Sequence, residues 1–241
     1  MTVRLLVSVR DAAEALLAAE AGADFIDLKE PANGALGALA PQQIAHIVSL
    51  LRLRYPALRL SATVGDLSLQ QADEILRRVQ RVASCGVDYV KVGLWPEPSE
   101  PGLAATLVDA LAACPAAIVP VFVADEGVDL ALVEHALARG AFPALMMDTA
   151  EKRRGSLLQR VPLATLAAFV AAVRARGVMA GLAGSLRAEN TDALRALAPD
   201  FAGFRGAVTR GDRVAALDPK LVRQLRRRLA AGTGAPLAAA A

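Results

Sequence analysis

Asp27 and Lys29 stand two positions apart at the end of a short apolar run, in the stretch ADFIDLKEPANGALG. Side chains two positions apart on a strand point to the same face, so we expect this carboxylate and this ammonium group to lie together. A buried lysine needs a partner, and its pKa shifts readily. An ion pair that closes the end of a core would explain these two residues alone, but similar charges recur along the chain.

Three later strand-like segments also carry charged residues. Lys91 lies within YVKVG, Asp148 ends PALMMD, and Arg205 follows DFAGF, while Lys152 comes four positions after Asp148. In a barrel of parallel strands, the carboxyl ends of all strands meet at one mouth. Core packing explains two lysines and two aspartates at one mouth poorly, because such groups can be buried there only by pairing with one another, as in active sites.

Two neighbouring lysines indicate carbonyl chemistry. One ammonium group lowers the pKa of the other, which gives a neutral amine that can attack a carbonyl and form a Schiff base. Nearby carboxylates can then move protons or keep the second ammonium charged. The pattern favours a Schiff-base enzyme without identifying the carbonyl compound.

A second set of residues favours phosphate binding. Gly184 and Ser185 precede a predicted helix, and Arg205 and Gly206 follow the last predicted strand. In many barrels these two loops hold a phosphate through backbone N–H groups, and an arginine can add charge-assisted hydrogen bonds. Ordinary turns are the alternative for these glycines. We interpret two further pairs, Asn33-Gly34 and Gly65-Asp66, as turns.

Short apolar runs alternate with helical patterns along the whole chain, which predicts a parallel sheet. Eight such units in one domain predict a closed (β/α)₈ TIM barrel, with a doubly wound sheet as the alternative. The predicted strands are 3–9, 24–29, 59–64, 88–93, 117–123, 143–148, 178–183 and 200–205. The predicted helices are 11–21, 41–54, 69–83, 103–112, 130–138, 162–176, 187–196 and 219–230.

Composition narrows the class of protein. The 241 residues suffice for one barrel domain, predicted over 1–231, and the small residues of 232–241 predict a disordered tail. A net charge of +3 and scattered arginines argue against binding to nucleic acid, and no apolar run approaches a membrane span. The two cysteines and two histidines do not stand at the spacing of metal ligands or redox pairs. They predict a reduced, cytoplasmic protein without a His-based triad or a His-rich metal site, although a carboxylate-held Mg²⁺ is not excluded. The alanine-rich helices are compatible with a homo-oligomer.

Seven blocks of the chain resemble, in order and spacing, the (5-formylfuran-3-yl)methyl phosphate synthase family, the furan-forming enzymes of methanofuran biosynthesis. The resemblance covers about residues 4–229, and its blocks are LLVSVRDAAEA, GADFIDLKEPANGALGA, SATVGD, DYVKVGL, MMDTAEKRRG, LAGSL and FRGAV. It implies a TIM barrel and a lyase that condenses two glyceraldehyde 3-phosphates, with no redox or metal cofactor.

The resemblance also implies roles for individual residues. Lys29 matches the Schiff-base lysine of the family, Asp27 its neighbouring aspartate, and Lys91 the lysine that transfers protons. Asp148 and Lys152 match a further aspartate–lysine pair. Because this chain reads EKRRG there, Arg153 or Arg154 is an alternative to Lys152 as the relevant cation.

Two other functions fit the same residues. A class I aldolase of the deoxyribose-phosphate type would use the same lysine pair and phosphate site, but would give a non-aromatic aldol. A non-catalytic barrel that binds sugar phosphates would have no need for paired lysines beside carboxylates.

Overall fold

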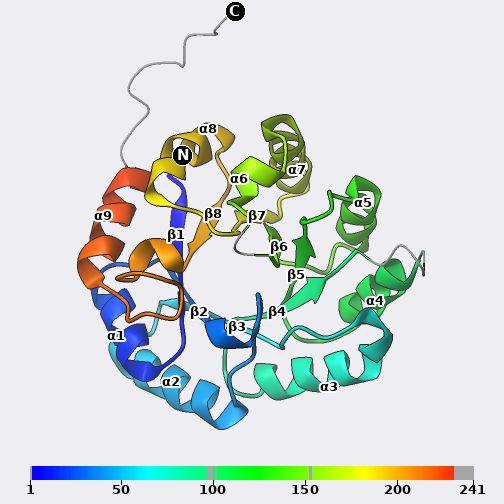
Figure 1. Cartoon of the computed structure of the whole chain (residues 1–241). Coiled ribbons are helices and arrows are strands. Elements are labelled where there is room, and N and C mark those ends of the chain that lie inside the picture. Colours follow the sequence, from blue (N-terminus) through cyan, green and yellow to red (C-terminus); the bar gives the residue numbers. More distant parts are fainter. Residues whose placement is uncertain (1, 97–99, 101, 152–153, 231–241) are drawn as a thin grey trace, which may run out of the picture.

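The computed structural model describes residues 2–96, 100, 102–151 and 154–230, which form a closed barrel of parallel strands (Figure 1). Each strand pairs with its neighbours along the chain, and β1 also pairs with β8, which closes the barrel. The strands are β1 (Arg4–Val9), β2 (Phe25–Leu28), β3 (Arg59–Thr63), β4 (Tyr89–Leu94), β5 (Ile118–Val123), β6 (Ala144–Asp148), β7 (Met179–Leu182) and β8 (Phe201–Phe204). The predicted (β/α)₈ barrel is therefore confirmed.

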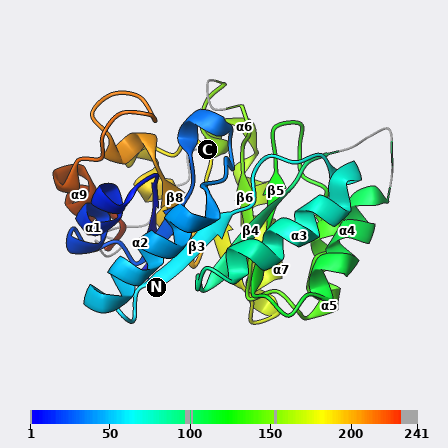
Figure 2. The same cartoon turned by 90° about the horizontal axis from the view of Figure 1, so that it is seen from below.

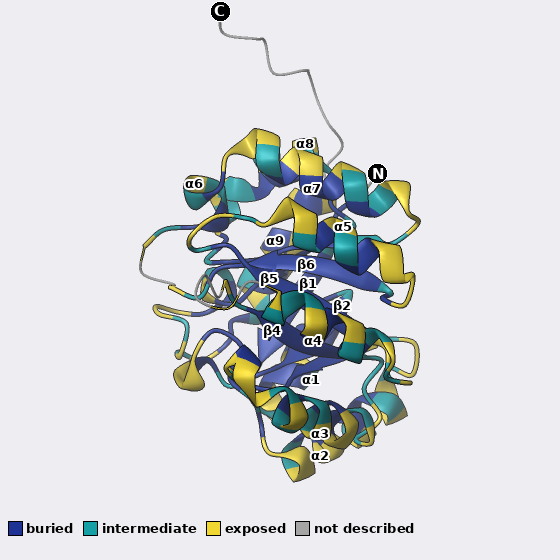
Figure 3. Ribbon diagram, turned by 90° about the vertical axis from the view of Figure 1, so that its right-hand side faces the viewer, coloured by how far each residue is buried: buried dark blue, intermediate teal, exposed yellow. Residues whose placement is uncertain are grey.

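Helices surround the barrel, and their buried sides face the strands (Figures 1 and 3). They are α1 (Ala12–Glu20), α2 (Pro41–Arg54), α3 (Ala72–Ala83), α4 (Leu103–Ala112), α5 (Leu130–Arg139), α6 (Leu157–Arg160), α7 (Leu163–Ala175), α8 (Thr191–Leu197) and α9 (Pro219–Ala230). Their ends follow local signals: the side chains of Asp11 and Asp129 cap α1 and α5, and proline opens α2 and α9. Each helix in the described ranges falls short of the length and apolarity of a membrane span.

The elements differ from the predicted ranges mainly at their ends. The predicted helices at 69–83 and 187–196 begin as the 3₁₀ turns η2 (Leu69–Gln71) and η3 (Ala188–Asn190) before α3 and α8. The turns η1 (Pro31–Asn33) and η4 (Gly206–Val208) and the short helix α6 were not predicted. Residues 231–241 lie outside the described ranges, so the domain end and the tail stay predictions.

Aromatic and aliphatic side chains fill the barrel interior at the end where the strands begin, which we call the barrel floor. Phe25 packs against Phe201 and Tyr89, with ring centroids 5.3 and 6.5 Å apart. Leu6 and Met146 belong to the same buried cluster. This packing fills the barrel floor.

An aspartate at the foot of β2, β4 and β8 ties each strand to the one before it. Each carboxylate accepts a hydrogen bond from a backbone N–H of the preceding strand, and the pairs are Asp24 with Leu5, Asp88 with Leu60 and Asp200 with Ala180. The donor–acceptor distances are 2.7 to 2.8 Å. The barrel floor is thus fixed by charge-assisted hydrogen bonds as well as by packing.

The loops at the opposite end form the mouth. Figure 2 views the barrel from the side, with the blue η1 turn and the orange loop that follows β8 on the same side of the barrel. These loops lie next to the carboxyl ends of the strands, where barrel enzymes carry their active sites.

We expect Gly181→Ala to destabilise the barrel floor. A Cβ atom at Gly181 would lie 2.2 Å from the Phe201 ring, and overpacking of this kind costs about 1–3 kcal/mol. Gly206→Ala is the matched control, because its Cβ would meet nothing within 4 Å, and we expect a change below about 0.5 kcal/mol. Urea unfolding measures both, and equal stability of the two variants would contradict the packing described for Phe201.

Candidate active site

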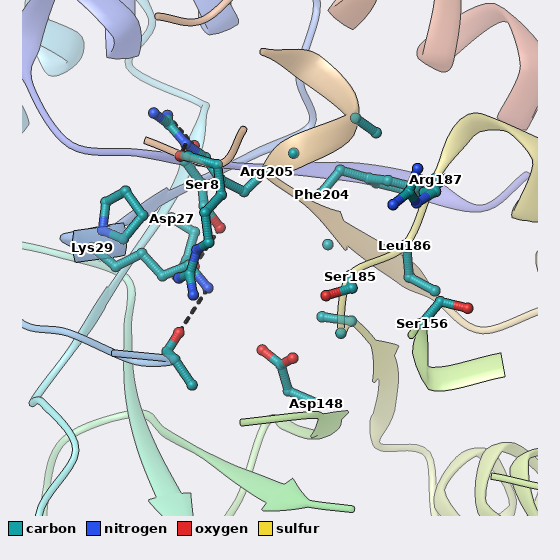
Figure 4. A pocket seen from close by; sticks show the side chains of 18 of the residues that line it. Ser8, Asp27, Lys29, Asp148, Ser156, Ser185, Leu186, Arg187, Phe204 and Arg205 are labelled. Atoms are coloured by element: carbon teal, nitrogen blue, oxygen red, sulfur yellow. Dashed lines mark hydrogen bonds between the residues drawn. The ribbon is translucent and has the colours of Figure 1, made fainter. Parts of the chain in front are cut away.

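The carboxyl ends of the strands enclose a cavity of about 1340 Å³. Asp27, Lys29, Lys91 and Asp148 all line it, as do the loops after β6, β7 and β8. Figure 4 shows Asp27 and Lys29 together, with Asp148 across the opening. The structure therefore brings together the four charged residues that the sequence placed at one mouth.

Asp27 lies at the centre of a buried polar cluster. Its carboxylate lies 2.9 Å from the Lys91 ammonium group and accepts hydrogen bonds from Ser61 at 2.7 Å and Ser8 at 3.1 Å. Burial alone would raise the pKa of Asp27, but the charges of Lys91 and Lys29 and the Ser61 hydrogen bond outweigh burial and hold this pKa below 3.8. Asp27 is thus a carboxylate held ionised inside the protein.

Lys91 is only 3% exposed and projects from the middle of β4. Burial lowers the pKa of Lys91 below its usual 10.5; Asp27 opposes this shift, and the charge of Lys29 adds to it. A lysine of lowered pKa gives up and takes up a proton more readily near neutral pH. The arrangement suits Lys91 to proton transfer.

Lys29 follows β2 directly and is 6% exposed. Its Nζ donates a hydrogen bond to the carbonyl oxygen of Ala35 at 3.2 Å, and within the described part of the chain this is its one hydrogen bond. The amine is therefore oriented from one side while it still lines the cavity, as a nucleophile requires.

Asp148 ends β6 and is 3% exposed. One of its oxygens accepts the N–H of Thr149 at 2.7 Å, and its charge acts on both Lys91 and Arg213. Lys152 and Arg153 lie outside the described residues, so the role predicted for this basic segment stays a prediction. Arg154, the other candidate cation, is exposed.

The loop after β7 comes close to the loop after β6. Gly184 has a φ of 110°, and a Cβ atom there would lie 2.8 Å from the Thr149 hydroxyl, so only glycine fits without movement. Ser185 follows with a φ of 46°, which is uncommon for a residue other than glycine. Both residues and Gly206 line the cavity. The helix predicted over 187–196 begins only at Thr191, with η3 before it.

The structure gives Arg205 a different environment from the one predicted. Its guanidinium forms a buried ion pair with Glu14 and also donates to the carbonyl oxygens of Ser8, Arg213 and Ala215. These contacts use all five N–H groups of the side chain. Arg205 therefore fixes the loop after β8, and because it also lines the cavity, the phosphate contact predicted for it stays a prediction.

Several residues of the site were not identified from the sequence. Asp66, interpreted as part of a turn, accepts hydrogen bonds from two backbone N–H groups of the loop after β2. Arg213 is half-buried and donates to the carbonyl of Gly34, and burial lowers its pKa against the opposing charge of Asp148. Ser8 and Ser61 could have been found from the sequence, because each is a polar residue in an apolar strand.

The described residues contain no group of three or more His, Cys, Asp or Glu side chains arranged to hold a metal ion.

We expect Arg205→Gln and Glu14→Gln to destabilise the protein similarly. Each substitution removes the closest charged partner of a buried group (Arg10 lies farther from Glu14, at 3.6 Å), which costs roughly 3–5 kcal/mol, and the double variant should lose less than the sum. Urea unfolding of the three variants measures the coupling. A loss confined to Arg205→Gln, with Glu14→Gln close to wild type, would argue against the ion pair as the main role of Arg205.

We expect the stabilisation from Asp27 to depend on pH. Because its folded-state pKa lies below 3.8, the unfolded chain takes up this proton first as the pH falls. The stabilisation is therefore complete above the unfolded pKa and disappears as the pH falls through the folded one. Asp27→Asn should cost roughly 3–5 kcal/mol near pH 7, and this difference from wild type should shrink below pH 3.8. Urea unfolding between pH 3 and 7 tests this, and a difference that does not change with pH would exclude it.

Comparison with known structures supports the fold alone. The structure superposes on a phosphoribosylanthranilate isomerase from Thermus thermophilus with a TM-score of 0.62, 19% identity and coverage of 95% of this chain and 98% of the other. For a 3-hexulose-6-phosphate synthase from Salmonella typhimurium, the TM-score is 0.61 at 16% identity, with coverage of 94% and 98%.

Comparison of sequences gives closer matches than comparison of structures. Proteins named (5-formylfuran-3-yl)methyl phosphate synthase from Methanopyrus kandleri and Archaeoglobus fulgidus are 35% and 32% identical, over 95% and 92% of this chain and 100% and 97% of their own lengths. A protein of Methylorubrum extorquens is 39% identical over 98% of this chain and 95% of its own length. A family model described as 4-HFC-P synthase matches residues 5–226. The chain therefore belongs to the 4-HFC-P synthase family.

Proposed function

We propose that this protein is a lyase that condenses two molecules of glyceraldehyde 3-phosphate into (5-formylfuran-3-yl)methyl phosphate, for the synthesis of a methanofuran-type one-carbon cofactor. Two triose phosphates lose one phosphate and two waters to give this six-carbon furan aldehyde, so the conversion balances without an oxidant or a reductant. The observation that carries the proposal is the pair of buried lysines, Lys29 and Lys91, beside Asp27 at the mouth of a barrel. Relatives that bear the synthase name support it.

The size of the cavity supports a reaction with two substrates. At about 1340 Å³ it exceeds the roughly 300–1,000 Å³ that is usual for a small-molecule pocket. It has Lys29 on one side and Ser185, in the loop after β7, on the other (Figure 4). One triose phosphate can thus be held on the lysine while the second approaches it.

Lys29 is the proposed nucleophile. Its amine attacks the carbonyl of one triose phosphate, after isomerisation to the ketone, and loss of water gives an iminium ion. Removal of a proton from the neighbouring carbon gives an enamine, which adds to the aldehyde of the second triose phosphate. Elimination of phosphate, ring closure and loss of two waters complete the furan, and aromatisation draws the sequence forward. Hydrolysis of the carbon–nitrogen bond takes up one water, in place of the water lost when the iminium formed, and releases Lys29, so the net loss is one phosphate and two waters.

Lys91 and the aspartates are the proposed proton carriers. The lowered pKa of Lys91 suits it to take and return protons at the iminium carbon, and the ionised Asp27 holds its ammonium group in place. Asp148, across the opening, can exchange protons with the second substrate. Lys152 is proposed to assist Asp148.

The loops after β7 and β8 are the proposed site for the retained phosphate. Gly184, Ser185 and Gly206 line this side of the cavity, and the tight backbone at Gly184 allows a close approach of a phosphate to N–H groups. Arg205 contributes indirectly, because it orders the loop through Glu14.

We expect Lys29→Ala to lose at least about 10³-fold in kcat and to form no covalent adduct with substrate. The assay incubates the protein with glyceraldehyde 3-phosphate alone and follows furan absorbance together with free phosphate. A borohydride-quenched aliquot, mapped by mass spectrometry, locates the adduct. Lys220→Ala, which removes an exposed lysine on α9, is the control and should match wild type.

Lys91→Met should keep the adduct but lose about 10²- to 10⁴-fold in kcat.

Three outcomes of this assay would contradict the proposal. An adduct on Lys29 without furan or phosphate release would indicate an aldolase instead. Turnover that persists in Lys29→Ala would exclude the Schiff base. A wild-type protein that binds the substrate without either signal would be a binding protein.

A further inference from the structure

The loop after β2, residues 30–37, is fixed by a carboxylate from the next strand's loop. Asp66 accepts the backbone N–H of Ala35 at 2.7 Å with one oxygen and that of Leu36 at 2.8 Å with the other. Hydrogen bonds to a charged acceptor are about twice as strong as neutral ones. Although Asp66 lies at the surface, both of its oxygens are therefore engaged with this loop.

The fit between Asp66 and the loop is close. A Cβ atom at Gly34 would lie 2.0 Å from Oδ2 of Asp66, and Gly34 has a φ of +106°, which favours glycine. The carboxylate therefore rests directly on the loop backbone, in a space that exists because position 34 has no side chain.

The loop is held at other points as well. Thr63 donates to the carbonyl of Gly37 at 3.0 Å, and Arg213 donates to the carbonyl of Gly34 at 2.9 Å. The side chains of Ala35 and Leu36 belong to the apolar cluster inside the barrel. The loop is thus an ordered part of the mouth. Asp66 accepts hydrogen bonds from Ala35 and Leu36, the two residues whose side chains enter the barrel.

Ala35 joins Asp66 to Lys29. Its N–H is bound by Asp66, and its carbonyl oxygen accepts the hydrogen bond from Lys29 Nζ at 3.2 Å. Since this is the one hydrogen bond of the amine within the described residues, the position of Ala35 determines where the amine points. A shift of this loop would move the acceptor and release Lys29 from its orientation.

A second aspartate holds the loop after β6 through the same type of hydrogen bond. The two carboxylate oxygens of Asp125, in the loop after β5, accept the backbone N–H groups of Ala150 and Glu151, just after Asp148. In both cases an aspartate from a neighbouring loop holds two successive N–H groups beyond a charged residue of the site. This recurrence favours a role in the geometry of the site over a chance surface contact.

We propose that Asp66 is a positioning residue, which orients Lys29 for attack on the substrate carbonyl through the backbone of Ala35. The inference rests on the proposed function, in which Lys29 is the nucleophile. Misplacement of a reacting group by about 1 Å can cost on the order of 10²-fold in rate, so the role has a measurable consequence.

The test is Asp66→Asn, which keeps the shape of the side chain but replaces one acceptor oxygen with a donor that faces a backbone N–H. We expect kcat and the rate of borohydride trapping at Lys29 to fall together by about 10- to 100-fold, with KM within about threefold of wild type. Asp88→Asn is the matched control, because Asp88 also accepts a backbone N–H, but at the opposite end of the barrel. It should lower the melting temperature and leave kcat and trapping unchanged in the folded protein.

Gly34→Ala tests the same contact from the other side, since it displaces the carboxylate but keeps its charge. The single variants and the double variant form a cycle, and we expect the double variant to lose less than the product of the two single losses. Wild-type trapping rates in both single variants, or a change in KM alone, would overturn the positioning role. If the wild-type protein itself forms no adduct on Lys29, the proposed function fails and this inference fails with it.

Discussion

The burial of opposite charges at one end of the barrel is the constraint on which the rest of the site depends. A lone buried ammonium or carboxylate is unstable in a protein interior, and pairs offset this cost only when their remaining hydrogen bonds are satisfied. Asp27, on β2, meets this condition through Ser8 and Ser61 on the neighbouring strands β1 and β3 and through Lys91 on β4. Lys29 lies in the same region, where the carboxylate of Asp27 is already paired with Lys91. The mouth thus contains one lysine that is paired with a carboxylate and one that is held mainly by a neutral carbonyl, and the different roles proposed for Lys91 and Lys29 rest on this difference.

One end of the barrel contributes mainly to stability, and the other carries the candidate active site. The aromatic floor around Phe25 and Phe201 excludes water from below, which strengthens the electrostatic interactions of the charges above it. The floor is also fixed by aspartates that bind strand N–H groups, and the mouth uses the same type of bond to hold its loops. The same type of hydrogen bond therefore fixes strands at one end of the barrel and loops beside the cavity at the other. This arrangement agrees with the general placement of active sites at the carboxyl ends of barrel strands.

The fold could be predicted from the sequence because its signals are local. Apolar runs of strand length, proline and aspartate at helix starts, and glycine at helix ends repeat along the chain, and the structure confirms the barrel they predict. The short helix α6 was missed because four residues show no helical period, and Pro162 separates them from α7. The starts of α3 and α8 were misplaced because a 3₁₀ turn and an α-helix have similar preferences at the first turn.

Residues of the site could be predicted only where a charged side chain stands within an apolar segment. Lys91 and Asp27 stand out because they are charges within apolar strands, and the structure places them in contact. Asp66 and Glu14 give no such signal, since an aspartate after a glycine and a glutamate in a helix are ordinary residues whose roles depend on distant partners. Arg205 is the clearest case, because its partner Glu14 lies 191 positions away. An arginine at a strand end looks the same in sequence whether it faces a substrate or a carboxylate of its own protein. The structure adds what the sequence lacks, because it shows that Arg205 is bound to Glu14 and supports the loop beside the cavity, while its contact with a ligand stays a prediction.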